Sequence, residues 1–181
     1  MRRACGLSST SALLADQFLQ AANYTAVGTT PGLWRSTVHS SYYAVFHAIC
    51  EAGEHMLFAD AVAAQLARRN VAHRTVVARC QHYSDAAVNK PDWKSERWSG
   101  PQQLTLPSID LVRTAGHVVA LQSLRIDADY NAEVGITKGD AQIASKKART
   151  SIETIRRLQA SQDDALLEVL RSIYFPTKRR D

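Results

Sequence analysis

The chain lacks the features that define several specialised protein classes. Its 181 residues include only 3 Cys, 5 Pro and 8 Gly. The cysteines are widely spaced and form no CxxC pair, so the sequence indicates neither a disulfide framework nor a cysteine zinc site. No apolar run approaches the roughly 20 residues that cross a bilayer. With 45% hydrophobic and 22% charged residues, the composition is instead that of an ordinary soluble globular domain.

Common catalytic and targeting motifs are missing as well. The sequence contains no GxxxxGK[ST], GxGxxG, HExxH or GxSxG pattern. We therefore expect no metal and no cofactor. The stretch from Ser8 to Ser11 and Asp16 interrupt any apolar core of a signal peptide, so we expect a cytoplasmic protein without membrane contact. The 22 basic against 17 acidic residues give a net charge of +5, which permits nucleic-acid contact but fits a solvated basic surface equally well.

Apolar residues recur at helical spacing almost throughout, and no alternating pattern predicts a pair of strands. The helices are predicted at about 11–26, 31–52, 59–83 with a break near Asn70, 108–131, 138–158 and 163–173. Residues 84–107 hold three of the 5 prolines and form a long connection, and residues 176–181 form a basic tail. The sequence thus predicts one all-α domain over residues 1–181, an antiparallel bundle of about five helices.

The predicted second helix carries a polar and aromatic stripe. Its members recur every four residues and so share one helix face: Arg35, His39, Tyr43 and His47. Trp34, Val38, Val45 and Ile49 form the neighbouring apolar face, and Gly53 is predicted to end the helix. Ordinary packing against another helix explains the stripe unless its members line a site.

Two further clusters combine arginine with groups that transfer protons. Arg125 and Asp129 are i,i+4 partners beside Tyr130, and a guanidinium held by a carboxylate can bind phosphate through two hydrogen bonds. Arg68, Arg69 and His73 lie together, and histidine with arginine suits RNA cleavage without a metal. A basic helix boundary is the plainer interpretation of this second group.

The connection adds an aromatic and basic segment. Trp93 and Trp98 alternate there with lysine and arginine, an arrangement that stacks single-stranded bases. Both indoles can equally anchor a long loop on the bundle.

Taken together, these segments resemble the HEPN superfamily, the "higher eukaryotes and prokaryotes nucleotide-binding" proteins. The stretch RSTVHSSYYAVFHAICEAG is similar to a family pattern of the form RSxxxxxYYAxFH, and LRIDADYN is similar to RxxADY. A later helix opening with a histidine, AHRTVVARC, and the helix KGDAQIASKKARTSIETI follow the same order. The resemblance covers roughly residues 10–160.

The resemblance implies an all-α bundle, frequent homodimers and a role in RNA or nucleotide biology. Many members are metal-independent endoribonucleases, often toxins inhibited by a nucleotidyltransferase-like antitoxin encoded in the same operon. Their catalytic motif is an arginine followed, after four to six residues, by a histidine. In this chain Arg125 is followed instead by Asp129 and Tyr130.

Three interpretations follow from the sequence. The first is a HEPN-fold toxin–antitoxin or defence component that binds and cleaves RNA, with catalytic roles for Arg125, Tyr130, Asp129, His47 and His73. RNA or phosphate would then be bound by Arg35, His39, Tyr43, Arg68, Arg69, Trp93 and Trp98. The second is a non-catalytic module of the same fold that binds a nucleotide or a protein. The third is an interaction subunit without a ligand.

Overall fold

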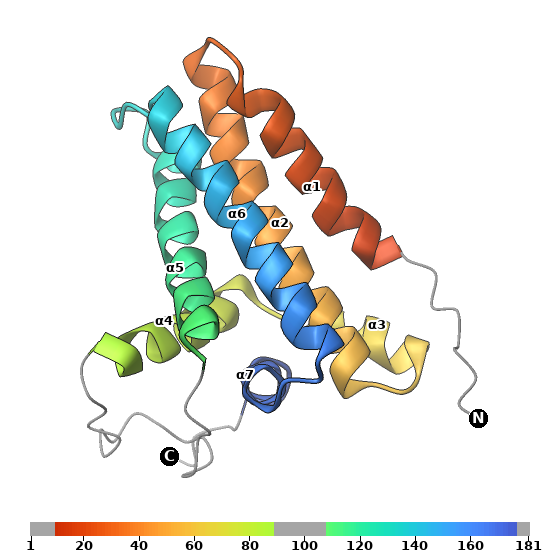
Figure 1. The fold of residues 1–181 in the computed structure, drawn as a ribbon. Coiled ribbons are helices and arrows are strands. Elements are labelled where there is room, and N and C mark those ends of the chain that lie inside the picture. Colours follow the sequence, from red (N-terminus) through yellow and green to blue (C-terminus); the bar gives the residue numbers. More distant parts are fainter. Residues whose placement is uncertain (1–9, 89–107, 177–181) are drawn as a thin grey trace.

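The protein is a bundle of α-helices. The computed structural model describes residues 10–88 and 108–176, and every regular element in these ranges is an α-helix. The helices are α1 (Thr10–Ala26), α2 (Pro31–Leu57), α3 (Ala61–Arg69), α4 (His73–Val88), α5 (Ile109–Tyr130), α6 (Lys138–Ala160) and α7 (Asp164–Tyr174). The predicted all-α class is confirmed, with seven helices in the described ranges rather than about five. Figure 1 shows α1, α2, α5 and α6 as long neighbouring helices, with α4 and α7 near one end.

Most helix starts follow from local capping chemistry. At the start of α5, the Ser108 hydroxyl accepts a hydrogen bond from the Leu111 amide and so caps the helix. Thr137 and Asp140 form a complete capping box at the start of α6. At α2 the N-cap residue Thr30 has an extended backbone but makes no side-chain capping bond, so proline in the first turn is the local start signal there.

Helix α2 is the centre of the bundle and contacts α1, α3, α5, α6 and α7. Ala44, Ala48 and Ala52 repeat every four residues on α2 and are at most 2% exposed, while Ala144 and Ala148 on α6 are fully buried. Because alanine has only a methyl group, these positions allow neighbouring backbones to approach closely. Helix α2 is therefore held by close packing against neighbouring helices on several sides.

The predicted end of α2 at Gly53 is wrong, because the helix continues to Leu57. A Cβ atom at Gly53 would lie 2.1 Å from the Tyr174 ring of α7. The Tyr174 hydroxyl donates a hydrogen bond of 2.7 Å to the Cys50 carbonyl. The glycine therefore makes room for α7 to dock rather than ending the helix.

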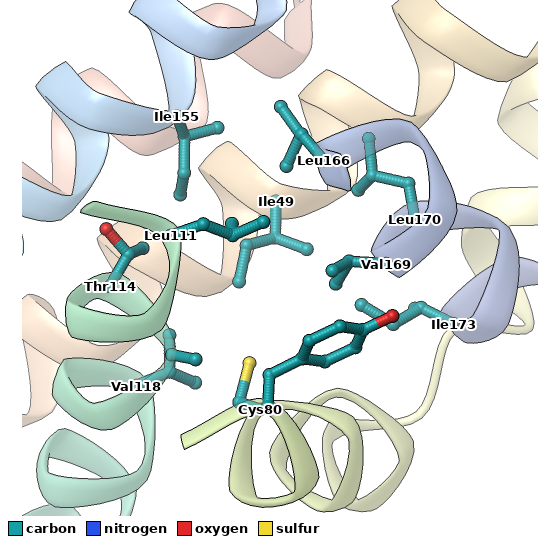
Figure 2. A pocket seen from close by; sticks show the side chains of 12 residues that line it. Ile49, Cys80, Leu111, Thr114, Val118, Ile155, Leu166, Val169, Leu170 and Ile173 are labelled. Carbon is teal, nitrogen blue, oxygen red and sulfur yellow. The ribbon is translucent and has the colours of Figure 1, made fainter. Parts of the chain in front are cut away.

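An apolar pocket lies where α2, α4, α5, α6 and α7 meet (Figure 2). Its lining includes Ile49 of α2, Cys80 of α4 and Ile155 of α6, with several leucine, valine and isoleucine side chains of α5 and α7. Cys50 and Cys80 are both buried. None of the candidate site residues lines this pocket, which belongs to the core.

Two predicted segments fall partly or wholly outside the described residues. Helix α4 continues to Val88, so the predicted connection at 84–107 begins later than expected. The rest of that connection, with Trp93 and Trp98, lies outside the described residues, as do residues 177–181 of the predicted tail. Among the helices that are described, none combines the length and apolar character that crossing a bilayer requires.

Candidate functional site

The polar stripe of α2 reaches groups on four other helices, α1, α3, α4 and α5. Its four members are spaced one turn apart, and α2 packs against both α1 and α5 (Figure 1). Phe18 of α1 stacks on Tyr43 and His47, with ring centroids 5.6 and 5.3 Å apart. The stripe thus lies in a seam between helices, with aromatic packing along one side.

Arg125 of α5 is the centre of the largest polar group in this seam. Its Nε lies 2.5 Å from Oδ2 of Asp129, one turn later on the same helix. Its Nη2 donates to the hydroxyls of Tyr43 at 3.2 Å and Tyr130 at 3.3 Å. With His39, these residues form what we term the Arg125 cluster: His39, Tyr43, Arg125, Asp129 and Tyr130.

The Arg125 guanidinium also lies over two aromatic rings. Its central carbon is 5.5 Å from the Tyr43 ring centroid and 5.1 Å from that of Tyr130. Such cation–π contacts add to the hydrogen bonds in fixing the guanidinium plane. The Arg125 side chain is 15% exposed, whereas Tyr130 is 73% exposed. One side of the cluster therefore faces solvent while its charged centre is largely shielded.

His39 is joined to the same carboxylate as Arg125. Its Nδ1 lies 3.1 Å from both Asp129 oxygens, and its ring centroid is 4.6 Å from that of Tyr43. Because an ionised carboxylate can only accept hydrogen bonds, Nδ1 is the donor in this contact. Asp129 thus connects the imidazole on α2 to the guanidinium on α5.

His47 lies about two turns after His39 on α2 and has a different environment. Its Nδ1 lies 2.9 Å from Nη2 of Arg68, whose Nη1 donates to Glu54 at 3.1 Å. Burial, with the positive charge of Arg68 and the nearby His73, lowers the pKa of His47 to about 4. The imidazole is therefore neutral at pH 7 and accepts the hydrogen bond from Arg68.

His73 begins α4 and packs against the aromatic residues of α2. Its ring stacks on Phe46 at 3.8 Å, and its Nδ1 lies 2.9 Å from the Tyr42 hydroxyl. Burial and the charge of Arg125 lower the pKa of His73, and burial raises that of Tyr42. Both groups are neutral at pH 7, and His73 meets the edge of the Tyr43 ring at 5.3 Å.

Arg35 binds the backbone at the end of α5. Its Nη1 donates to the Ala128 carbonyl at 2.7 Å, and its Nη2 donates to the carbonyls of Asn131 and Val134. The last carbonyls of a helix have no partner within the helix, so a cation there satisfies them. Arg35 therefore fixes the turn of α5 that carries Asp129 and Tyr130.

The structure brings most of the sequence-predicted residues together, although in two groups. His39, Tyr43, Arg125, Asp129 and Tyr130 form the Arg125 cluster, whereas Arg68 and His47 form a second group beside His73. Arg69 is exposed at the end of α3, and Trp93 and Trp98 lie outside the described residues. The contacts of Phe18, Tyr42, Phe46 and Glu54 were not predicted, although Tyr42 and Phe46 lie within the YYAxFH motif.

The chemistry of the Arg125 cluster suits an anion better than a metal ion. No group of three or more His, Cys, Asp or Glu side chains in the described part of the chain could hold a metal ion. The cluster combines a guanidinium and two phenols, which can donate hydrogen bonds to phosphate oxygens.

The comparisons with known proteins add no relative. No family model matches the chain, and no curated protein or solved structure does so either.

Proposed function

We propose that this chain is a HEPN-type helical protein that binds RNA at the Arg125 cluster and cleaves it without a metal ion. The single observation that supports the proposal best is the fixed guanidinium of Arg125, bounded by Asp129 and two tyrosine hydroxyls. A guanidinium that is already oriented loses little side-chain entropy when it meets a phosphate. Its second terminal nitrogen, Nη1, has no hydrogen-bond partner among the described residues, so a phosphate oxygen can be its acceptor.

RNA is a suitable ligand for chemical reasons. The net charge of +5 favours approach to a polyanion. Exposed Tyr130 beside Arg125 offers a ring face on which an unpaired base can stack. Cleavage needs no metal, because the neighbouring 2′-hydroxyl of RNA is the nucleophile and Arg125 can stabilise the charge that develops on the phosphorus oxygens.

The wider setting follows from the HEPN resemblance. We propose a cytoplasmic toxin–antitoxin or defence component, a homodimer, with a nucleotidyltransferase-like antitoxin or another operon-encoded protein as its partner. The non-catalytic alternative is favoured by one observation, which is that Nε and Nη2 of Arg125 already have partners within the protein. In that case the cluster would bind a nucleotide or a protein without cleaving RNA.

The first prediction is that Arg125→Ala weakens RNA binding at least tenfold. Loss of a charge-assisted hydrogen bond costs roughly 1.5–3 kcal/mol, which corresponds to about 10–150-fold in affinity. Binding is measured by fluorescence anisotropy with a labelled single-stranded RNA, and cleavage by incubation with total RNA in EDTA. Arg125→Lys, which keeps the charge, should bind with intermediate affinity.

Arg113→Ala is the matched control, because Arg113 lies on the same helix, is 59% exposed and is distant from the cluster in sequence. It should bind RNA almost as the unmodified protein does. Circular dichroism of each variant establishes that the helices are intact. Wild-type affinity in a folded Arg125→Ala variant would overturn the site, and tight binding without cleavage would favour the non-catalytic alternative.

A further inference from the structure

The three imidazoles around Tyr43 are not equivalent as proton acceptors. His47 lies against Arg68, and burial with the charge of Arg125 opposes protonation of His73. A proton placed on either ring would therefore meet a guanidinium charge nearby. The Arg125 guanidinium is close to His39 as well, but there the Asp129 carboxylate contacts both groups and offsets its charge. Within the described part of the chain, His39 is the one of the three whose ring nitrogen contacts a carboxylate, that of Asp129.

The contact with Asp129 also fixes the tautomer of His39. Since Nδ1 donates to the carboxylate, Nε2 carries the lone pair and is free to accept a proton. The same carboxylate stabilises the imidazolium that would form. A histidine held by a carboxylate in this way is the usual arrangement of a general base in hydrolytic and transfer enzymes.

His39 is also accessible to a ligand. Its side chain is 41% exposed, while the rings of His47 and His73, which are partly buried, pack against Phe18 and Phe46. The Asp129 carboxylate contacts both His39 and Arg125, so a phosphodiester bound at the guanidinium lies close to the imidazole. The Asp129 side chain thus holds both the imidazole of His39 and the guanidinium of Arg125.

We infer that His39 is the catalytic base of the proposed RNA cleavage, with Asp129 as its positioning residue. The inference rests on the proposed function and reassigns His39 from phosphate binding to proton transfer. Nε2 of His39 takes the proton of the 2′-hydroxyl, and the O2′–P bond forms as the P–O5′ bond breaks. The departing 5′-oxygen takes a proton from water, and His39 later releases its own proton to solvent. The products are a 2′,3′-cyclic phosphate and a 5′-hydroxyl.

The test combines removal of the imidazole with its chemical replacement. In His39→Ala, the cleavage rate of a labelled RNA measured in EDTA should fall by roughly 10²–10⁴-fold, the usual contribution of a general base. RNA affinity should stay within about threefold of wild type. The lost ring leaves a partly exposed gap beside Tyr43, so added imidazole should restore part of the rate. His55→Ala is the control, because His55 is exposed on the same helix and contacts no cluster residue.

The positioning role of Asp129 needs a test whose result differs from that of a simple loss of structure. In Asp129→Asn the amide can turn its donor group towards His39 and favour the wrong tautomer, so cleavage should fall while helix content and RNA affinity change less. Imidazole should not rescue this variant, because its own ring at position 39 still fills the space. A second substitution, His39→Gln, retains a polar side chain in case the alanine variant folds poorly.

The outcomes separate this inference from the proposed function. Cleavage by His39→Ala or His39→Gln at the wild-type rate would overturn the role of His39 while leaving RNA cleavage in place. Loss of cleavage without any imidazole rescue would overturn it as well. If wild-type protein binds RNA through Arg125 but leaves it intact, His39 is not a base and the binding function remains. If wild-type protein neither binds nor cleaves RNA, both proposals fall.

Discussion

Around Tyr43, the same residue type is placed in three electrostatic environments. His39 contacts a carboxylate, His47 contacts a guanidinium, and His73 is enclosed by aromatic rings. Neutral imidazole is favoured in the second and third settings, because both burial and a nearby positive charge oppose protonation. The environment rather than the residue type therefore determines which ring can serve a proton-transfer step.

Acid should destabilise the protein through His47. Its pKa is lowered to about 4 in the folded state, while an unfolded histidine titrates near 6.5. Below about pH 6.5 the unfolded chain therefore binds a proton that the folded protein does not, and the free energy of unfolding falls as pH drops. Because the ring is only half buried, we expect a loss of about 1 kcal/mol between pH 7 and pH 5 rather than the full shift.

Urea unfolding at pH 7 and pH 5 measures this effect. In His47→Gln the difference between the two pH values should shrink by about that amount, although stability at pH 7 also falls. The exposed His55→Gln serves as the comparison and should leave the difference unchanged. An unaltered pH dependence in His47→Gln would show that other groups carry the acid sensitivity.

The sequence predicted which residues of the seam are polar and the pairing of Arg125 with Asp129 within one helix, but not the individual contacts between helices. The four-residue spacing on α2 and the i,i+4 spacing of Arg125 and Asp129 are local features, so each stripe was predictable. The contact of His39 with Asp129 spans 90 residues, and that of Arg35 with the end of α5 spans 93. No local pattern encodes such pairs, because they depend on how α2 and α5 are oriented in the bundle.

At the scale of elements, the junction between α6 and α7 carries an unusual backbone. Gln162 has a φ of +53°, while its amide bonds to the Gln159 carbonyl and the Asp163 amide bonds to the Leu158 carbonyl. This is the Schellman arrangement that usually ends a helix with glycine. A residue with a Cβ atom is strained in this conformation by about 1 kcal/mol.

Gln162→Gly should therefore stabilise the protein slightly, by up to about 0.5 kcal/mol after the greater flexibility of glycine in the unfolded chain is included. Thermal unfolding followed by circular dichroism would detect the rise in Tm. Gln162→Ala is the matched variant: it removes the same side chain but keeps the Cβ atom, so it should give no such gain. Equal melting temperatures for the two variants would mean that the backbone strain is not released.

Helix boundaries were predictable where side chains cap the backbone locally. Ser108 at α5 and the Asp163 cap at α7 both lie where the sequence pattern places a helix start. The end of α2 was not predictable, because Gly53 is required by the ring of Tyr174 rather than by a turn. In the sequence, a glycine that ends a helix cannot be distinguished from one that makes room for a neighbouring side chain.

For the whole molecule, the docking of α7 on α2 depends on that glycine. Gly53→Ala should lower the free energy of unfolding by roughly 1–3 kcal/mol, because the new Cβ atom displaces the Tyr174 ring and its hydrogen bond to Cys50. Combining it with Tyr174→Ala tests the contact directly. The double variant should be less destabilised than the sum of the two single variants, since the clash is then absent.

Urea unfolding of the four proteins in this cycle gives the coupling energy. Simple additivity would show that Gly53 and Tyr174 do not contact one another. As a control for the helix itself, Gly32→Ala near the start of α2 places a Cβ atom where nothing lies within 4 Å. That substitution should be neutral or slightly stabilising.

The central position of α2 has a consequence for when conformational entropy is lost. Five helices hold α2 in place, and α2 in turn carries His39 and Tyr43, while Arg35 fixes the last turn of α5. The backbone and rotamer freedom of these side chains is therefore lost when the chain folds, not when a ligand arrives. A ligand that meets the Arg125 cluster encounters groups that are already ordered, so more of the interaction free energy remains available as affinity.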